Sequence, residues 1–295
     1  MYKLDHAVAE LLRDVGRSVV FTRFRKLAAG EVHEKTPGEI VTAVDHEAEE
    51  ILTERLAALL PESRVIGEEA CEDDPSLIEG LDRGIVWLVD PLDGTANFAA
   101  GKPPFGLIIA LAEDGVTKRG WLYDPLTDRL CHAALGEGAF IDGRRLRSAA
   151  PGASRAVATL ATQFMPANMA ETVRGNAALH FDLKPIPRCA AAHYPMLCEG
   201  ETHVAMFQRT LPWDHAAGAL LLTEAGGYIS RWDGSPYRFY DDGFGIVAAS
   251  DETTWMRAMT ALNLDDDAMP QLRNLLPQKL EAAAYVTARR AGAKH

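Results

Sequence analysis

The sequence contains no apolar stretch long enough to cross a membrane. A spanning helix needs about 20 consecutive apolar residues, and every apolar run of this chain is interrupted well before that length. The N-terminal stretch MYKLDHAVAELLRDVGRSVV has acids and arginines where a secretory signal would be apolar. These absences predict a cytoplasmic protein with no membrane partner.

Cysteine and basic residues are both scarce. Four cysteines in 295 residues, at spacings that match no zinc site, predict reduced and partly buried thiols. Lys and Arg number 30 against 42 Asp and Glu, which gives a formal net charge of -12. Because phosphate contacts need clustered basic side chains, this balance argues against nucleic acid as a partner. A phosphorylated substrate remains compatible with it, because cations bound by acidic groups reverse the local field.

Two helices and a long run of strands are expected in the first half of the chain. Apolar residues at helical spacing predict a helix over residues 3–28 and a second one that begins near VTAVD at 41–45 and stops at Pro61, with a polar loop or hairpin between them. The nearly all-apolar segment GIVWLVD is typical of a strand that is buried on both faces. The apolar segments that follow, up to residue 146, are separated by turn residues, which predicts an antiparallel run of strands.

Strand and helix patterns alternate beyond about residue 153, which predicts an α/β arrangement there. The chain is therefore expected to have the α/β fold class, with an α+β N-terminal half and an α/β C-terminal half. The expected domains are residues 1–152, residues 153–265 and a helical C-terminal tail over residues 266–295.

Acidic residues stand at the ends of three expected elements. Glu68 and Glu69 follow RVIG, Asp90 and Asp93 follow GIVWLV, and Asp214 begins the helix PWDHAAG. Taken singly, they have ordinary interpretations as a solvated pair, turn formers and an acid in the first turn of a helix. An ionised carboxylate after so apolar a run is nevertheless costly unless a cation or hydrogen bonds compensate it. Together, these acids suit Mg²⁺ or Mn²⁺ and the hydrolysis of a phosphate ester between two such ions.

Three motifs carry a resemblance to a known family. DPLDGTANF at residues 90–98, GEE at 67–69 and WDHAAGALLLTEAGG at 213–227 are similar to the signature motifs of the inositol monophosphatase family of Mg²⁺-dependent, often lithium-sensitive phosphatases. VTAVD at 41–45 resembles a fourth segment of that family. The resemblance implies a layered αβαβα sandwich of the inositol monophosphatase/fructose-1,6-bisphosphatase type, with the site between its two halves.

The resemblance also implies the metal ligands. Glu68, Asp90 and the backbone carbonyl of Leu92 would hold one ion, and Asp90, Asp93 and Asp214 would hold a second. A third, weaker ion near Glu68 is usual in the family. Mg²⁺ is the expected cofactor and Mn²⁺ its expected substitute, whereas Li⁺ and Ca²⁺ are expected to inhibit.

The catalytic roles follow from the same resemblance. Glu68 and Thr95 would orient and deprotonate a water molecule that attacks the phosphorus in line, without a covalent intermediate. Gly94 and Thr95 would offer backbone amides to the phosphate oxygens.

Lys35, Thr42 and Asp45 would support this machinery. In the family, the threonine and aspartate of the VTAVD segment order the threonine and water network beside the metals, and a lysine in the preceding loop lies near the third ion. Thr42 has a second interpretation as the N-cap of the helix that follows, and the two roles can coexist.

The match to the family is weakest where its members contact the alcohol part of the substrate. Counting back from Trp213 without gaps puts Phe207 where inositol-specific members have an acid. RCAAAHYP stands where those members have a small Gly-Ser/Thr-Ala segment. His193 and Arg209 are candidates for binding a second anionic group or a different alcohol, although a histidine on a helix is more often structural.

The predicted function is Mg²⁺-dependent hydrolysis of a small phosphorylated substrate by a homodimer. Inositol monophosphate, histidinol phosphate, a 3′(2′),5′-bisphosphate nucleotide and fructose bisphosphate all remain open as substrates. The alternative from another class is a regulatory family member that binds protein or RNA and has incidental phosphatase activity. The complete acid set favours the enzyme, because a binding module has no need of it.

Overall fold

The computed structural model describes residues 3–28, 30–36, 39–152, 154–163, 165–241 and 245–262. The chain divides into two compact units. The first unit comprises Met1–Arg145, Pro187–Pro195 and Pro212–Leu221, and the second comprises Leu146–Ile186, Met196–Leu211 and Leu222–His295. The sequence predicted a boundary between the two halves near residue 152. In the structure, two later segments, one of which carries Asp214, group with the N-terminal unit instead.

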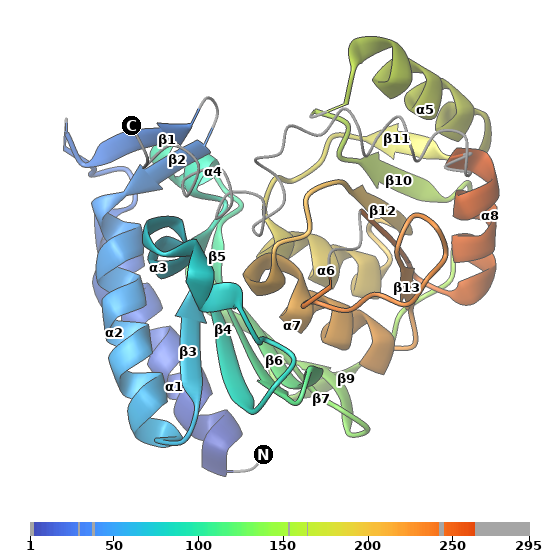
Figure 1. Cartoon of the computed structure of the whole chain (residues 1–295). Helices are drawn as coiled ribbons and strands as arrows, with labels where there is room; N and C mark the ends of the chain where they lie inside the picture. The colour runs from blue at the N-terminus through green and yellow to red at the C-terminus, as the bar shows by residue number, and fades with distance from the viewer. Residues whose placement is uncertain are drawn as a thin grey trace, which may run out of the picture. The chain divides into compact units, whose positions relative to one another are not determined.

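A seven-stranded sheet lies at the centre of the first unit (Figure 1). In spatial order its strands are β3 (Arg64–Gly67), β4 (Ile85–Asp93), β5 (Gly106–Glu113), β6 (Val116–Asp124), β7 (Arg129–Ala134), β8 (Gly138–Ile141) and β9 (Arg144–Leu146). The strands from β4 to β8 pair antiparallel, which confirms the expected run. β3 pairs parallel with β4. The helix α3 (Glu68–Asp73) and the 3-10 helix η2 (Pro75–Ile78) lie in the crossover that a parallel pair requires.

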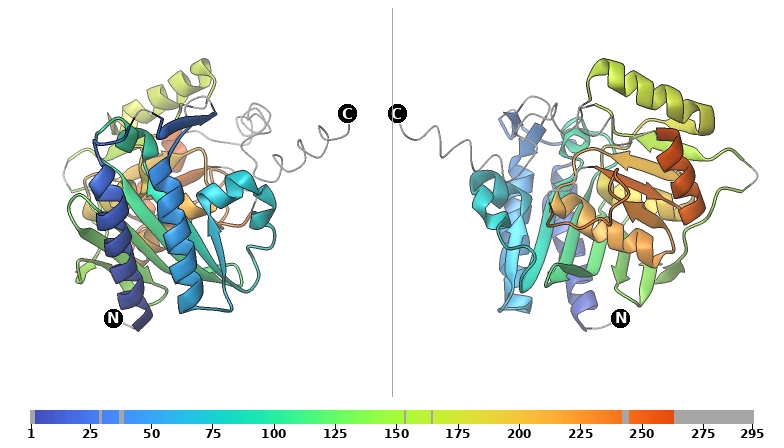
Figure 2. Two further views of the ribbon diagram at one scale, coloured as in Figure 1. Left: turned by 90° about the vertical axis from the view of Figure 1, so that its left-hand side faces the viewer. Right: turned by 45° about the vertical axis from the view of Figure 1, so that its right-hand side comes forward.

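Two helices, α1 (Lys3–Val15) and α2 (Ala43–Leu59), cover one face of this sheet (Figure 2). Their apolar stripes form one buried core with alternate residues of β4, β5 and β6. The helix expected over residues 3–28 is shorter, because its α-helical part ends at Val15 and is followed by the π-helix η1 (Gly16–Phe21). The segment between the helices is a hairpin, in which β1 (Val32–Thr36) pairs antiparallel with β2 (Glu39–Thr42).

The opposite face of the sheet contacts the first turns of α6 (Ala190–Glu199) and α7 (Pro212–Glu224). Leu107 and Ile109 of β5 belong to the core under α1 and α2, so the side of Gly106 is the other face. A Cβ atom at Gly106 would lie 2.7 Å from Cβ of Ala191 in α6, and one at Gly120 would lie 2.9 Å from Cβ of Ala217 in α7. Both helices therefore approach the strands closely, and this places the start of α7 beside the sheet that carries Asp90.

The second unit is built on a five-stranded sheet with the order β11-β10-β12-β14-β13. Its strands are β10 (Val157–Leu160), β11 (Asp182–Lys184), β12 (Val204–Phe207), β13 (Tyr228–Ser230) and β14 (Ile246–Ala249). β10 pairs parallel with β11 and β12, and β14 pairs antiparallel with β12 and β13. The helices α5 (Ala167–His180) and α8 (Glu252–Leu262) share a core with these strands.

The strand and helix alternation expected beyond residue 153 is present in this unit. The sequence pattern did not predict β13. The helical tail predicted over residues 266–295 lies outside the described residues.

Two further expectations concern the thiols and the membrane. All four cysteines are buried thiols. Among the described residues, no helix is both long and apolar enough to cross a membrane.

Candidate metal centre

Asp90 lies near the C-terminal end of strand β4 and is buried. Val86 to Val89 are fully buried, and Asp90 is only 2% exposed. The backbone amide of Leu92 donates a 3.0 Å hydrogen bond to Asp90 Oδ1, which fixes the carboxylate. The pairing of β4 with β5 is irregular between Asp90 and Asp93. A bulge of this kind bends a strand and re-aims its side chains, and such bulges are common beside active sites.

Three carboxylates from different elements, including that of Asp90, lie close together. Glu68 begins α3 directly after β3, and Asp214 lies in the first turn of α7. One carboxylate oxygen from each of Glu68, Asp90 and Asp214 lies within 4.8 Å of the others. Burial raises the pKa of Asp90 well above its ordinary value, and the nearby carboxylates of Glu68, Asp93 and Asp214 raise it further. A cation among these oxygens would relieve both costs, and hard oxygen donors of this kind fit Mg²⁺ or Mn²⁺.

Asp93 has a different environment from the other three acids. Its Oδ2 accepts a 2.6 Å hydrogen bond from the backbone amide of Ala191, at the start of α6. Cys189 Sγ lies 3.9 Å from the carbonyl oxygen of Asp93. Burial raises the pKa of Asp93, whereas the hydrogen bond from Ala191 acts in the opposite direction. Asp93 thus links the end of β4 to the start of helix α6.

A chain of hydrogen bonds runs from Leu92 through Thr95 and Asp45 to Thr42. Thr95 Oγ1 lies 2.8 Å from the carbonyl oxygen of Leu92 and 3.0 Å from Asp45 Oδ1. Asp45 Oδ2 accepts hydrogen bonds from Thr42 Oγ1 at 2.6 Å and from the Thr42 amide at 2.9 Å. Gly94 precedes Thr95 with φ of 82°, a left-handed conformation that favours glycine, and this turn begins the short helix α4 (Thr95–Ala99).

Burial is the main reason that the pKa of Asp45 is raised to about 6. Asp45 is 1% exposed and Thr42 is fully buried. Thr42 is the N-cap of α2 and forms a capping box with Asp45. The N-cap interpretation of Thr42 is therefore confirmed. Asp45 of the same capping box also contacts Thr95, and the supporting role beside the metals stays a prediction.

The remaining predicted residues are His193, Arg209 and Lys35. His193 lies in α6 with 3% of its surface exposed, and burial lowers its pKa to about 3. A neutral and buried imidazole argues against the predicted contact with an anionic substrate. Arg209 is half-buried and follows β12 in the second unit. The side chain of Lys35 lies outside what the structure describes.

Glu49 is a supporting residue that the sequence motifs did not indicate. Its carboxylate accepts hydrogen bonds from the backbone amides of Glu69 at 2.8 Å and Ala70 at 2.7 Å. Glu49 is 6% exposed and therefore holds the first turn of α3, which carries Glu68, against α2. A signal was available in the sequence, because Glu49 shares the buried side of its helix with Leu52 and Leu56.

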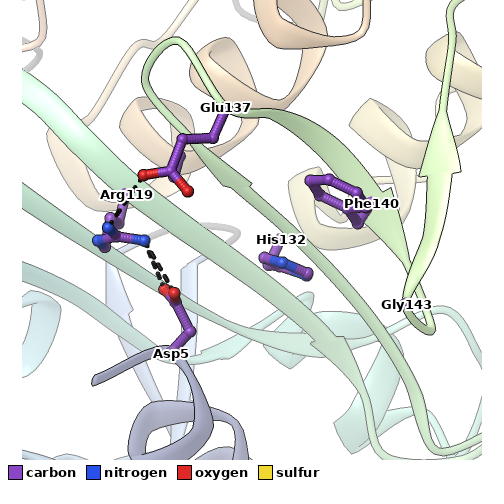
Figure 3. Close-up of a pocket in the computed structure, with 7 residues that line it drawn as sticks. Asp5, Arg119, His132, Glu137, Phe140 and Gly143 are labelled. Carbon is purple, nitrogen blue, oxygen red and sulfur yellow. Dashed lines mark hydrogen bonds and ion pairs between the residues drawn. The ribbon is translucent and has the colours of Figure 1, made fainter. Parts of the chain in front are cut away.

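A separate pocket of about 210 Å³ lies elsewhere in the first unit (Figure 3). Arg119 Nη1 donates to both carboxylate oxygens of Asp5, at 2.9 and 2.8 Å, and Arg119 Nη2 lies 3.3 Å from Glu137 Oε1. His132 stacks on Phe140 with their ring centroids 5.1 Å apart. The lining residues are Asp5, Arg119, His132, Ala134, Glu137, Phe140 and Gly143. No predicted site residue is among them, so this pocket is not part of the acid cluster.

Comparison with known proteins identifies the family of this chain. The profile of the Inositol monophosphatase family matches residues 3–263. The chain belongs to the inositol monophosphatase family. This membership confirms the resemblance drawn from the DPLDGTANF and WDHAAG motifs, and it makes the chain a phosphoric monoester hydrolase of a metal-dependent family.

Two curated relatives carry different names. Inositol-1-monophosphatase of Bacillus subtilis is 29% identical over 251 residues, which cover 81% of this chain and 89% of the relative. A Vibrio cholerae protein named Nus factor SuhB is 33% identical over 222 residues, which cover 74% of this chain and 80% of the relative. The names of these relatives therefore include both an inositol-1-monophosphatase and a Nus factor.

Solved structures of the inositol monophosphatase family confirm the fold class. Inositol monophosphatase-II from Staphylococcus aureus matches with a TM-score of 0.77 at 25% identity, over 92% of this chain and 97% of that chain. Structures of SaIMPase-II with inositol monophosphate and with 2′AMP bound each match with a TM-score of 0.76, at 23% and 24% identity. The last two show a likeness of fold.

Proposed function

We propose that the chain hydrolyses a small phosphomonoester with Mg²⁺ held at the acid cluster. The observation that carries this proposal is the approach of Glu68, Asp90 and Asp214 to within 4.8 Å in a member of a metal-dependent family. Glu68, Asp90 and the Leu92 carbonyl would hold one ion, and Asp90, Asp93 and Asp214 a second. A third, weaker ion would lie near Glu68. Bound Mg²⁺ would polarise the phosphate and lower the pKa of water.

The chain's own residues supply the route for the proton. Thr95 Oγ1 has one proton and two acceptors in reach, Asp45 Oδ1 and the Leu92 carbonyl oxygen. When the proton is directed to Asp45, a lone pair of Thr95 Oγ1 can accept a proton from the attacking water. The raised pKa of Asp45 makes its carboxylate a better acceptor in this relay. Glu68 would orient the water, and the amides of Gly94 and Thr95 would bind the phosphate.

The substrate proposal follows from the residues that precede Asp214. Phe207, where inositol-specific relatives have an acid, is 8% exposed at the end of β12. A site that lacks the acceptor for a hydroxyl discriminates weakly in favour of a polyol. We therefore propose that the enzyme is not dedicated to inositol monophosphate, and that a histidinol ester or a bisphosphate nucleotide serves at least as well. Arg209 would contact a second anionic group. The fold itself is compatible with different esters, since SaIMPase-II binds both inositol monophosphate and 2′AMP.

A substrate panel tests this function. Phosphate release would be measured with inositol 1-phosphate, histidinol phosphate and adenosine 3′,5′-bisphosphate, each with Mg²⁺ and with EDTA. We expect hydrolysis that requires Mg²⁺ and a kcat/KM for the inositol ester no more than about 10-fold above both rivals. Equal rates in EDTA would contradict the metal proposal. An inositol preference of 10-fold or more would contradict the substrate proposal alone.

A regulatory role is the second candidate, and the 33% identity to a protein named Nus factor SuhB is what favours it. Binding to another protein does not need three carboxylates gathered within 4.8 Å, whereas binding a metal ion for hydrolysis uses such a group. The acid cluster therefore favours the enzyme. The proposal further includes Mn²⁺ as a substitute ion, inhibition by Li⁺ and Ca²⁺, a homodimer and a cytoplasmic location.

A further inference from the structure

Helix α6 contacts the predicted metal ligand Asp93 and also contacts His215, which follows the predicted ligand Asp214. Its first turn is held by Asp93, whose Oδ2 accepts the 2.6 Å hydrogen bond from the Ala191 amide. One turn later, Oη of Tyr194 lies 2.9 Å from Nδ1 of His215, within a hydrogen bond. His215 directly follows Asp214 in the first turn of α7. A single turn of α6 thus connects Asp93 to His215, the residue that follows Asp214.

The contact between Tyr194 and His215 is buried and closely fitted. Tyr194 is fully buried and His215 is 3% exposed. The Tyr194 ring packs against Gly218 of α7, where an added Cβ atom would lie 1.9 Å from Cδ2 of the ring. A hydrogen bond in such surroundings is costly to leave unmade, since either partner would then be a buried polar group without its acceptor or donor.

Asp214 needs such a support because its neighbours repel it. One oxygen of its carboxylate lies within 4.8 Å of carboxylate oxygens of Glu68 and Asp90. Before an ion binds, this repulsion favours movement of the first turn of α7 away from β4. A tie from α6 at the adjacent residue opposes that movement and keeps Asp214 in place for the ion.

We propose that Tyr194 is a positioning residue, which acts through His215 to hold Asp214 beside Asp90 and Asp93 for the metal. The proposal rests on the proposed function of the acid cluster. Tyr194 would touch neither metal nor substrate, so its loss should weaken metal binding more than it changes the chemistry of the loaded site. Changes to groups that orient metal ligands typically cost 10-fold to 100-fold in metal affinity.

Calorimetric titration with Mn²⁺ tests this role in the full chain. Tyr194→Phe removes only the hydroxyl, and we expect it to raise the Kd for Mn²⁺ about 10-fold. Tyr123→Phe is the matched control, because Tyr123 is also fully buried and donates a 2.9 Å hydrogen bond to Asp128. This control should bind Mn²⁺ as the wild type does. At saturating Mn²⁺, the kcat of Tyr194→Phe should return to within a few-fold of wild type.

Two changes at His215 provide an independent measurement. His215→Asn keeps a polar group near the position of Nδ1 and should retain near wild-type affinity for Mn²⁺. His215→Leu removes that polar group and should raise the Kd for Mn²⁺ as much as Tyr194→Phe does. The double variant should show no further rise, because both changes remove the same hydrogen bond.

The outcomes separate the inference from the proposed function. Wild-type affinity in Tyr194→Phe, or an equal loss in Tyr123→Phe, would overturn the positioning role while leaving the metal centre intact. Wild-type affinity in Asp90→Asn would overturn the metal centre and the inference with it.

Discussion

Asp90→Asn is expected to abolish turnover and, at the same time, to stabilise the metal-free protein. Asp90 is 2% exposed and shares a 4.8 Å group with Glu68 and Asp214. The asparagine keeps an oxygen for the hydrogen bond from the Leu92 amide, removes one of the repelling charges and adds a donor to the other two. Changes to groups that only orient metal ligands cost up to about 100-fold, so the loss of a ligand charge should lower kcat/KM by more than ~100-fold.

The stability gain has a defined dependence on pH. The pKa of Asp90 is raised in the folded protein, so the folded state holds this proton more tightly than the unfolded state. That contribution is complete below the unfolded pKa of about 3.9, and the wild type loses it as pH rises through the folded value. Asparagine has no proton to lose, so its advantage over wild type should grow as pH rises from about 4 towards neutrality.

Thermal unfolding in EDTA, repeated with Mg²⁺, measures both effects. In EDTA near pH 7, we expect the variant to unfold roughly 2–4 °C higher than wild type. Added Mg²⁺ should raise the unfolding temperature of the wild type and leave that of the variant almost unchanged. Two results would contradict the account. A variant less stable than wild type in EDTA would show that Asp90 is not repelled by neighbouring carboxylates, and a variant that Mg²⁺ stabilises as much as wild type would show that Asp90 is not a metal ligand.

Thr95→Val is expected to lower kcat on the order of 100-fold with little change in KM. Valine has nearly the shape of threonine but lacks the hydroxyl that lies 3.0 Å from Asp45 Oδ1 and 2.8 Å from the Leu92 carbonyl oxygen. If that hydroxyl passes a proton only as the water attacks, its loss affects the transition state and not substrate binding.

Thr95→Ser is the control for this prediction, because serine keeps the hydroxyl. It should retain kcat within about 10-fold of wild type, and steady-state kinetics at saturating Mg²⁺ would compare the two variants. A change confined to KM in Thr95→Val would assign Thr95 to substrate binding instead of proton transfer.

The sequence was sufficient for the elements and the acids that have strong local signals. The apolar run before Asp90 predicted a buried strand, and helical spacing predicted α7. The ends of these elements, together with the acidic pair after RVIG, placed Glu68, Asp90 and Asp214 as candidates. The structure brings these three together. The family motifs linked them because the motifs record a spatial arrangement that periodicity alone does not contain.

The hydrogen bonds that support the site could not be predicted in the same way. Glu49 binds amides that lie about 20 residues further along the chain, and Tyr194 meets His215 across two helices. Such contacts depend on how α2, α6 and α7 pack on the sheet, and no local pattern specifies that packing. His193 could not be placed from the sequence either. It was a candidate for substrate binding, and it is buried in the structure.

Anomalous diffraction from crystals soaked in Mn²⁺ tests the metal centre most directly. The account predicts a strong anomalous peak bonded to the carboxylates of Glu68, Asp90 and Asp214, and no such peak in crystals of Asp90→Asn. Wild-type crystals in saturating Mn²⁺ that show no peak at these carboxylates would contradict it.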